Sequence, residues 1–391
     1  MTERLYYRDS YLTEFRARVV DASPDRKRVY LDRTAFYPTS GGQPFDTGQL
    51  GGACVQEVID EGERIAHVLS DGISESEVLG RIDRSRRFDH MQQHTGQHLL
   101  SAVLIEMFDA PTVGFHLGAE SSTIDVAKLL ETQQLQEAER RANQIVFENR
   151  PVTVNFQHSS EDLGLRKATD REGEVRIVSI KDFDRSACGG THVSATGEIG
   201  AILLRKLDRL RGNLRIEFLC GARAVGRARA DFEALSHIAR AFSSPLDETP
   251  ALVDAQREKL QEADKERRRL ALELAQSGGR ESHAGTVPGP DGIRRLLRRV
   301  DSLSEESRAE AQSFAAAGRA ICLAFCENPP SVLLACSSDS AIHAGNALKA
   351  ALSAVGGRGG GNAALAQGSV PSKEALDQVV QSLQSQLRFL A

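Results

Sequence analysis

Two histidines near the end of the first quarter of the chain have a spacing typical of metal ligands. His94 and His98 lie in a segment whose apolar residues follow helical spacing. On a helix, this spacing places both imidazoles on one face, one turn apart, where they could hold one divalent metal ion. The alternative is a pair of ordinary helical histidines, one packed and one exposed, and this pair alone leaves both interpretations open.

A second pair of candidate ligands, Cys188 and His192, flanks two consecutive glycines. The glycines disfavour a helix and allow a tight turn in which both side chains point to one centre. One thiolate and three imidazoles form a zinc ligand set, although Cys188 could instead be a buried structural thiol. We therefore predict one Zn²⁺ per chain. Its four ligands would be His94, His98, Cys188 and His192.

Two further features bear on this site. His90 precedes His94 by four residues and shares its helical face, but we interpret it as a surface histidine of the first helical turn. A zinc ion with four protein ligands is usually structural, whereas a catalytic zinc keeps one position open. The sequence does not decide between these two arrangements.

The elements that position these residues predict a multidomain α+β protein, since 391 residues exceed one ordinary domain. Short β-rich runs and Gly-rich turns in residues 1–83 predict a small β-barrel or meander. Residues 84–222 predict an α+β domain with helices over about 89–108 and 130–147, followed by strands. This second domain would contain the zinc site.

The remainder of the chain predicts two further parts. Residues 223–280 are charged, Ala-rich and Leu-spaced, which predicts a long helical arm broken near Pro245. Composition predicts a linker over residues 278–290. Residues 281–391 predict a C-terminal α/β domain that begins with a helix from Gly292.

Composition limits the functional classes. The net charge of −5 argues against a protein whose whole surface binds nucleic acid, although local basic clusters remain possible. The sequence has no apolar run near the ~20 residues that span a bilayer, and it shows no secretory signal. We therefore expect a cytoplasmic protein without a membrane partner. The six cysteines show no disulfide pattern.

Four segments carry a resemblance to one family. Residues 90–101, paired with residues 188–193, resemble the editing domain of alanyl-tRNA synthetase and of its free-standing relatives, the AlaX proteins. Residues 36–48 resemble the family's glycine motif, and residues 215–221 resemble the strand that closes the editing domain. Residues 356–361 with 366–368 resemble the glycine-rich signature of the synthetase's C-terminal, DHHA1-like domain, which DHH-type phosphoesterases share.

The resemblance implies a trans-editing hydrolase of the long-form AlaX type. Such a protein would deacylate mischarged tRNA(Ala), chiefly seryl-tRNA(Ala) and secondarily glycyl-tRNA(Ala), without ATP. The β domain begins near residue 10, which leaves no room for the aminoacylation core that precedes editing in the synthetase. Pro38 and the start of the helix at His90 depart from the synthetase pattern and fit the free-standing branch better.

Five residues near the motifs could contact the amino acid. Thr39, Gln97 and Thr191 could hydrogen-bond the serine hydroxyl, which is the group that separates serine from alanine. Their ordinary alternatives are a turn residue, a surface amide and a loop cap. Gly41 and Gly42 could bring the β domain close to the pocket, or could simply form a turn. Backbone N–H groups of the turn after Cys188 could point at the oxyanion.

Local basic clusters suit RNA phosphates. One cluster occupies a predicted hairpin beside the site, and another precedes the zinc helix. A solvated charged face is the alternative for the residues of both clusters. Arg358 would contact the tRNA elbow by analogy with the family, unless its glycine-rich segment is a flexible loop. The basic candidates are Arg84, Arg86, Arg87, Arg205, Lys206, Arg209, Arg211, Arg215 and Arg358.

Other functions stay open at this point. The chain could be a non-catalytic tRNA-binding module stabilised by zinc, or an editing enzyme of another aminoacyl specificity, such as the threonyl type. A phosphoesterase is disfavoured because the sequence lacks an Asp-His-His cluster. A homodimer could form through the arm or the C-terminal domain, although Gln256 and Arg267 at seam positions argue against a strong coiled coil.

Overall fold

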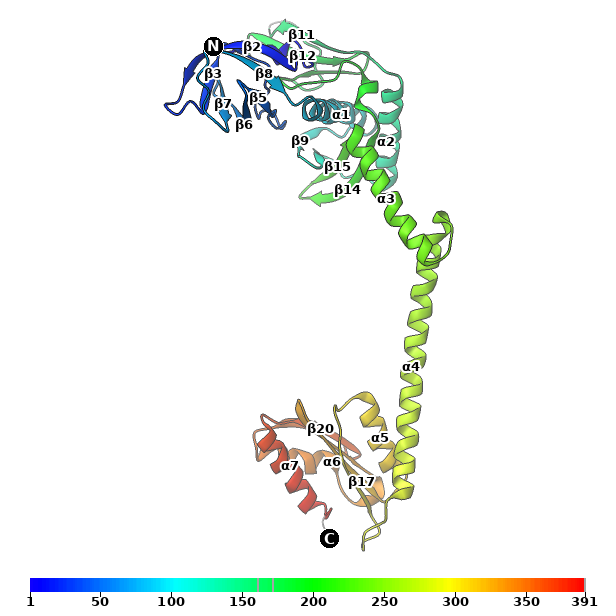
Figure 1. The fold of residues 1–391 in the computed structure, drawn as a ribbon. Helices are drawn as coiled ribbons and strands as arrows, with labels where there is room; N and C mark the ends of the chain where they lie inside the picture. The colour runs from blue at the N-terminus through cyan, green and yellow to red at the C-terminus, as the bar shows by residue number, and fades with distance from the viewer. Residues whose placement is uncertain (160–161, 171, 390–391) are drawn as a thin grey trace. The chain divides into compact units, whose positions relative to one another are not determined.

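The computed structural model describes residues 1–159, 162–170 and 172–389 and divides the chain into two compact units. The first unit is Met1–Ile238 and the second is Ala239–Ala391. Figure 1 shows the course of the chain through both units. Among the described residues, we find no helix with both the length and the apolar character that a membrane span requires.

A closed six-stranded barrel occupies the start of the first unit, with the strand order β2-β3-β7-β6-β5-β8. Alternate residues point inward, and side chains such as Phe15, Leu31 and Val55 form its core. The barrel that the sequence predicted is therefore confirmed. Its strands are β2 (Glu14–Ala22), β3 (Arg28–Leu31), β5 (Gly48–Leu50), β6 (Ala53–Asp60), β7 (Ile65–Leu69) and β8 (Glu77–Ile82), and β1 (Glu3–Arg4) pairs with β4 (Arg33–Thr34) outside it.

The helix that carries the histidine pair, α1 (Arg84–Phe108), begins five residues earlier than predicted. Asp83 causes the early start, because its carboxylate accepts hydrogen bonds from the backbone N–H groups of Ser85 and Arg86 at 3.0 and 3.1 Å. The helix is buried almost continuously from Arg87 to Leu104. It therefore lies at the centre of the first unit, where its polar side chains must find partners inside the protein.

Two antiparallel sheets complete the first unit. One has the order β14-β15-β10-β9, and the other has the order β11-β12-β13. Helix α2 (Thr132–Phe147) packs with α1 and the larger sheet in one apolar core. The strands are β9 (Thr112–Leu117), β10 (Ser122–Val126), β11 (Val152–His158), β12 (Glu174–Ile180), β13 (Asp184–Ala187), β14 (Ile202–Leu210) and β15 (Asn213–Cys220).

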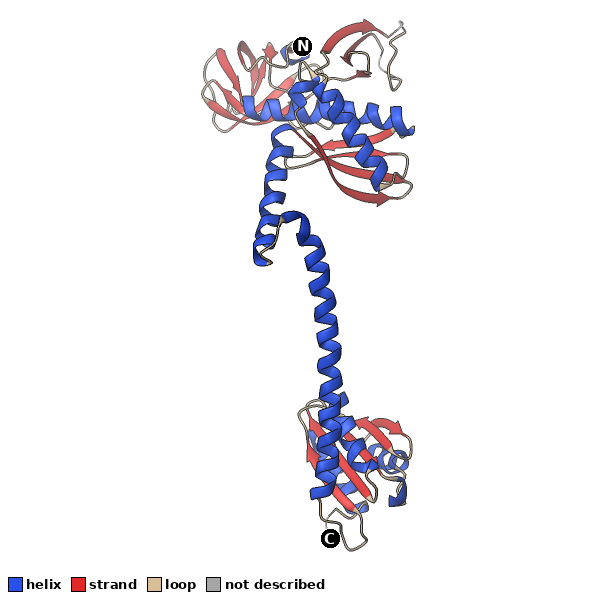
Figure 2. Ribbon diagram, turned by 90° about the vertical axis from the view of Figure 1, so that its right-hand side faces the viewer, coloured by secondary structure: helices blue, strands red, loops and turns tan. Residues whose placement is uncertain are grey.

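The second unit contains a five-stranded sheet with helices on both faces, which can be followed in Figure 2. Helices α6 (Ala344–Ser353) and α7 (Lys373–Gln386) cover one face, and α5 (Glu305–Ala316) covers the other. The strand order is β16 (Arg294–Arg299), β17 (Ala320–Glu327), β18 (Pro330–Cys336), β20 (Leu365–Ser369) and β19 (Arg358–Gly361).

The predicted arm consists of α3 (Gly221–Ala241) and α4 (Thr249–Gly285), with the break at Pro245 where it was predicted. The linker prediction was wrong at its start, because Gly278 and Gly279 lie inside α4. A Cβ on Gly279 would come within 2.3 Å of the carbonyl oxygen of Glu310 in α5. Glycine is therefore used here for close helix packing rather than for a chain break.

In the second unit, one further local prediction needs correction and one alternative interpretation is excluded. The segment after Gly292 is strand β16, parallel to β17, and not a helix. The glycine-rich segment is not a flexible loop, because residues 358–361 form strand β19 beside β20. A Cβ on Gly359 would lie 2.4 Å from the Cα of Gly368, so these glycines allow two strands and α6 to pack closely.

Candidate metal centre and its pocket

The two predicted ligand pairs come together from distant segments of the chain. His94 and His98 project from α1, and Cys188 and His192 belong to the turn that follows β13. The four potential ligand atoms all lie within 4.8 Å of one another. The Cys188 Sγ is 3.4 Å from Nε2 of His94 and 3.3 Å from Nε2 of His192. The arrangement offers three imidazoles and one thiol to a single centre.

Each of the three imidazoles has a second contact at Nδ1. The Nδ1 of His94 lies 2.8 Å from Oε1 of Gln43, and the Nδ1 of His192 lies 3.2 Å from Oγ1 of Thr95. The Nδ1 of His98 lies 3.5 Å from Oδ2 of Asp184, an ion-pair distance rather than a hydrogen bond. Such partners fix the ring orientation and leave Nε2 free for a metal ion.

Gly190 allows the turn to approach α1. A Cβ at this position would lie 2.2 Å from Cε1 of His94 and 3.0 Å from Oε1 of Gln43. At Gly189 the nearest atom to an added Cβ is the Tyr7 hydroxyl, at 3.6 Å. The second glycine of the pair is therefore the one that the site requires. The N–H of Gly190 donates to the Cys188 sulfur at 3.4 Å, so this one of the candidate oxyanion donors is engaged within the turn.

The ionisation of the cluster follows from its burial and its crowding. Burial opposes ionisation of Cys188, but the three surrounding imidazoles hold the thiol pKa well below its ordinary value. Burial, with the nearby His94, lowers the pKa of His192 to about 3. Burial also opposes protonation of His98, yet the Cys188 thiolate and Asp184 raise its pKa to about 9. A thiolate and imidazole nitrogens are the donors that zinc prefers, so the residues fit this metal.

A cavity of about 400 Å³ opens beside these four residues. His94, His98 and Cys188 line it, whereas His192 is absent from the described residues that form its wall. The approach to the centre is therefore over the face that the other three ligands share. Gln97 and Gly41 also line this cavity.

Gln97 has an acceptor atom without a protein partner at the cavity wall. Its Nε2 donates to Oγ of Ser101 at 2.8 Å, and that hydroxyl lies 2.8 Å from Oγ1 of Thr112. Its Oε1 is buried, and no described residue donates a hydrogen bond to it. Gln97 is only 3% exposed, so it is not a surface amide. A buried acceptor of this kind favours a bound donor.

The other predicted substrate-binding residues lie elsewhere. Thr191 is fully buried, and its hydroxyl accepts a hydrogen bond from Nε2 of Gln43 at 2.8 Å. The Thr39 hydroxyl accepts from the backbone N–H of Phe45 at 3.2 Å, as a turn residue would. Neither threonine belongs to the described wall of the 400 Å³ cavity.

Gly42 joins the barrel to the sheet at the cavity. Its carbonyl accepts a hydrogen bond from the N–H of Leu117 at 3.1 Å. A Cβ at this position would lie 2.8 Å from the ring of Phe115, which also lines the cavity. The glycine motif therefore brings the barrel to the rim of the cavity.

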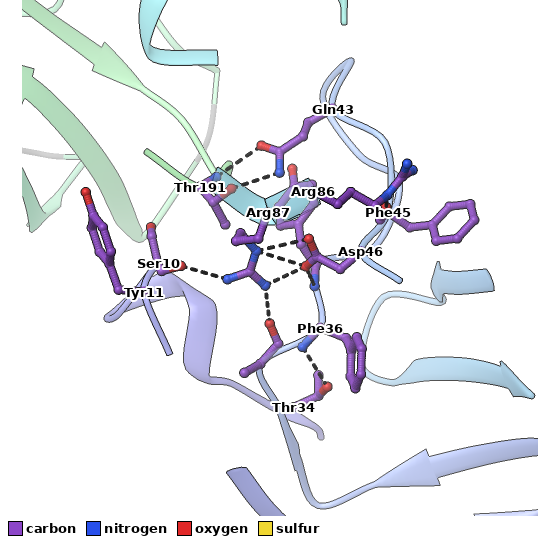
Figure 3. A network of polar contacts seen from close by, with 12 residues as sticks. Ser10, Tyr11, Thr34, Phe36, Gln43, Phe45, Asp46, Arg86, Arg87 and Thr191 are labelled. Carbon is purple, nitrogen blue, oxygen red and sulfur yellow. Dashed lines mark hydrogen bonds and ion pairs between the residues drawn. The ribbon is translucent and has the colours of Figure 1, made fainter. Parts of the chain in front are cut away.

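Two residues that were predicted to be exposed are buried. His90 is 1% exposed, and burial lowers its pKa to about 4. Arg87 is 1% exposed and pairs with the fully buried Asp46, with Nε 3.0 Å from Oδ1 (Figure 3). Its other nitrogens donate to the carbonyl oxygens of Ser10 and Ala35. Arg87 therefore holds the glycine motif to α1 and is not available to RNA.

The basic hairpin lies on β14 and β15, and β14 is at the opposite edge of its sheet from β9. It is therefore not beside the cavity, which β9 lines. Arg205 pairs with Asp231, and Lys206 pairs with Asp208 at 2.9 Å. Arg215 pairs with Asp125 at 2.7 Å. The exposed candidates without an ion-pair partner among the described residues are Arg84, Arg209, Arg211 and Arg358.

Sequence reasoning missed the residues that support the ligands, namely Gln43, Thr95 and Asp184. Gln43 lies within the recognised glycine motif, and Thr95 lies between the two histidines, so both were close to the pattern. Their role depends on which nitrogen of each ring faces the centre, and spacing does not reveal this. The sequence around Asp184 does not indicate its role, because Asp184 contacts a histidine, His98, that lies 86 positions earlier in the chain.

Two family models match the chain. The model described as "Threonyl and Alanyl tRNA synthetase second additional domain" matches residues 175–217, and the DHHA1 domain model matches residues 312–388. The first match contains Cys188 and His192, and the second covers most of the C-terminal sheet. A barrel, a histidine–cysteine centre and a DHHA1 domain in this order define a protein of the alanyl-tRNA editing class.

The curated relatives specify the family. The chain is 32% identical to the alanyl-tRNA editing protein AlaX-L of Pyrococcus horikoshii, over 99% of this chain and 100% of that protein. The chain belongs to this AlaX-L family. It is also 33% identical to the alanine–tRNA ligase of Methanoregula boonei and 31% identical to that of Pyrococcus abyssi. It spans 42% and 44% of these ligases, respectively.

One solved structure gives a weak likeness. The C-Ala domain of Aquifex aeolicus alanyl-tRNA synthetase aligns with 24% of this chain and 91% of that domain, at 18% identity. Its TM-score of 0.23 is too low to establish a shared fold.

Proposed function

We propose that this chain is a zinc-dependent hydrolase that removes the wrong amino acid from tRNA(Ala), chiefly serine and secondarily glycine. As a member of the AlaX-L family, the chain is an aminoacyl-tRNA deacylase. The observation that carries the zinc proposal is the convergence of His94, His98, Cys188 and His192 beside a 400 Å³ cavity. The cavity is of the size that small-molecule sites have.

The substrate bond is an ester between an amino acid and a ribose hydroxyl. Zinc, when bound, would polarise the ester carbonyl or lower the pKa of a water molecule. Gln43, Thr95 and Asp184 hold the three imidazoles in place through Nδ1, so the ligands are set before the substrate arrives. The open face between His94, His98 and Cys188 directs the ester to one side of the centre.

Gln97 supports selectivity for an amino acid with a hydroxyl. Its amide nitrogen donates to Ser101, and its buried Oε1 is an acceptor without a partner among the described residues of this cavity wall. A serine hydroxyl can donate to this atom, whereas alanine would leave it unpaired. A site that hydrogen-bonds a substrate hydroxyl can reject the analogue that lacks it by about 10⁴-fold. Glycine also lacks this donor, so the contact with Gln97 favours serine over glycine as well as over alanine.

The test combines metal content with three substrates. We expect the purified protein to contain about one zinc ion per chain and to deacylate seryl-tRNA(Ala) faster than glycyl-tRNA(Ala) and far faster than alanyl-tRNA(Ala). Cys188→Ala and His98→Ala should each lose zinc and activity together. An active Cys188→Ala protein would refute the mechanism. Zinc without deacylation would favour an RNA-binding module, and cleavage of seryl-tRNA(Thr) would indicate threonyl-type specificity.

The second unit would contribute tRNA binding. Arg358 is exposed on β19, at the edge of the C-terminal sheet, and Arg209 and Arg211 are exposed at the hairpin of the first unit. Such residues would contact phosphates and give salt-dependent affinity. Arg358→Glu should therefore raise KM for tRNA more than it lowers kcat. Deacylation would take place in the cytoplasm, where aminoacyl-tRNA is used in translation.

We also propose that the chain forms a homodimer through the helical arm. Helix α4 exposes Leu260, Leu270 and Leu274 at 66%, 50% and 75%. Exposed leucines at helical spacing favour association with a second helix. Sedimentation of the protein and of a Leu260→Glu, Leu274→Glu double variant would test this.

A further inference from the structure

The cavity beside the metal centre has a buried floor and an exposed rim, and the two are lined by chemically different residues. The residues nearest the centre are buried: Gln97 is 3% exposed, and His98 is 5% exposed. Other lining residues are exposed, including Lys167 and Ala168 on the segment before β12 and Val113 on β9. The floor therefore offers the metal ligands and one acceptor atom, whereas the rim offers a cation and apolar surface.

Two neighbouring cations line this rim, but one of them is already engaged. Arg166 donates from Nε to Oδ1 of Asp184 at 2.6 Å and from Nη2 to Oγ of Ser186 at 3.0 Å. Its backbone N–H also donates to the carbonyl oxygen of Arg185 at 2.9 Å. These bonds anchor the rim segment to β13 and pair the charge of Arg166 with Asp184.

The next residue, Lys167, is in the opposite situation. Its side chain is exposed, and no described carboxylate pairs with it. It lines the same cavity as the metal ligands. Because Arg166 anchors the backbone, the lysine ammonium is held at the rim while its charge stays available.

Resting on the proposed function, we propose that Lys167 binds the terminal phosphodiester of the RNA while the aminoacyl ester lies at the cavity floor. The ester oxygen belongs to the last ribose of the RNA, and the nearest anion to that ribose is its own 5′ phosphate. A substrate whose amino acid reaches Gln97 must therefore bring this phosphate toward the exposed end of the cavity. Lysine is suited to this contact as a point charge.

The experiment compares two substrates that differ in this phosphate. Seryl-tRNA(Ala) contains the terminal phosphodiester, and the 2′(3′)-O-seryl ester of adenosine lacks it. Lys167→Ala should raise KM for seryl-tRNA(Ala) by about 5- to 10-fold with kcat little changed. It should leave kcat/KM for seryl-adenosine unchanged, and Lys167→Arg should restore most of the loss. Equal effects on both substrates, or no effect on either, would overturn the proposal.

Binding of uncharged tRNA separates this proposal from the proposed function. One lost phosphate contact at a single-stranded end should lower the slope of log Kd against log salt by about 0.7. Lys128→Ala is the matched control, because Lys128 is exposed in the same unit and donates to the carbonyl oxygen of Phe108 outside the cavity. If wild type cleaves neither substrate, the proposed function fails. The binding experiment tests the phosphate contact independently of cleavage. If the slope of log Kd against log salt is the same for Lys167→Ala and wild type, the phosphate contact is overturned.

Discussion

Oε1 of Gln43 lies 2.8 Å from Nδ1 of His94, so a residue of the barrel's glycine motif holds a candidate ligand on α1. The same oxygen accepts from the backbone N–H of Thr191 at 3.1 Å, and Nε2 of Gln43 donates to the Thr191 hydroxyl at 2.8 Å. One fully buried side chain thus connects the barrel, α1 and the turn that carries Cys188 and His192.

Replacing Gln43 should therefore weaken metal binding without removing a ligand. We expect Gln43→Ala to lower the zinc affinity by about 10- to 100-fold, the usual effect of losing a residue that orients a metal-bound histidine. Competition against a chromogenic chelator measures this affinity. Gln49→Ala is the control, because Gln49 is exposed on strand β5. Equal zinc affinities for the two variants would contradict a role for Gln43.

The two glycines after Cys188 should respond differently to alanine. Gly190→Ala should lower zinc affinity by at least about 10-fold, because its Cβ would lie 2.2 Å from Cε1 of His94 and would displace this ligand. Gly189→Ala should bind zinc like wild type, since its Cβ would meet no atom closer than 3.6 Å. Zinc titration of both variants measures the two affinities. A lower zinc affinity for Gly189→Ala than for Gly190→Ala would contradict the described conformation of the turn.

The ion pair between Asp46 and Arg87 should matter mainly for stability. Both side chains are buried, at 0% and 1% exposure, so Asp46→Ala would leave a buried cation without its partner. Such a loss costs about 3–5 kcal/mol of unfolding free energy. Glu14→Ala breaks the Arg81 pair, whose side chains are 60% and 61% exposed, and should cost at most about 1 kcal/mol. Urea unfolding of the first unit compares them, and similar losses would contradict this account.

His67 should make the barrel less stable in acid. It is fully buried beside the Thr34 hydroxyl, and burial lowers its pKa from 6.5 to about 4. Below pH 6.5 the unfolded chain binds a proton that the folded chain does not, so stability falls as pH decreases toward 4. At pH 4.5 the loss relative to pH 7 should reach about 2–3 kcal/mol.

His67→Gln should reduce this pH dependence, because glutamine retains polar atoms near Thr34 but does not titrate. The measurement is the free energy of urea unfolding of the first unit at pH 7 and pH 4.5. His116→Gln serves as the control, since His116 is exposed on β9. If His67→Gln lost as much unfolding free energy between pH 7 and pH 4.5 as wild type, another group would be responsible for the acid sensitivity.

Local patterns carried the sequence predictions that succeeded. Short β-rich runs and Gly-rich turns predicted the barrel, and helical spacing predicted the helix of His94 and His98. Local patterns did not reveal the positions where a glycine allows two elements to pack closely. Gly279 suggested a chain break but packs α4 against α5, and the segment of Gly359, for which a flexible loop was one alternative, forms a strand that approaches its neighbour closely. A missing Cβ permits both outcomes, and the neighbouring element decides between them.

The sequence by itself determined which side chains could ligate a metal and which family the chain resembles, because both depend on residue type and short spacing. Only the tertiary structure decided that the two pairs share one centre, that Gln43 and Asp184 orient their rings, and that Arg87 is buried rather than exposed. These relationships join positions far apart in the chain. They arise when packing brings polar groups of distant segments together in the interior, where each buried polar group must find a partner within the protein.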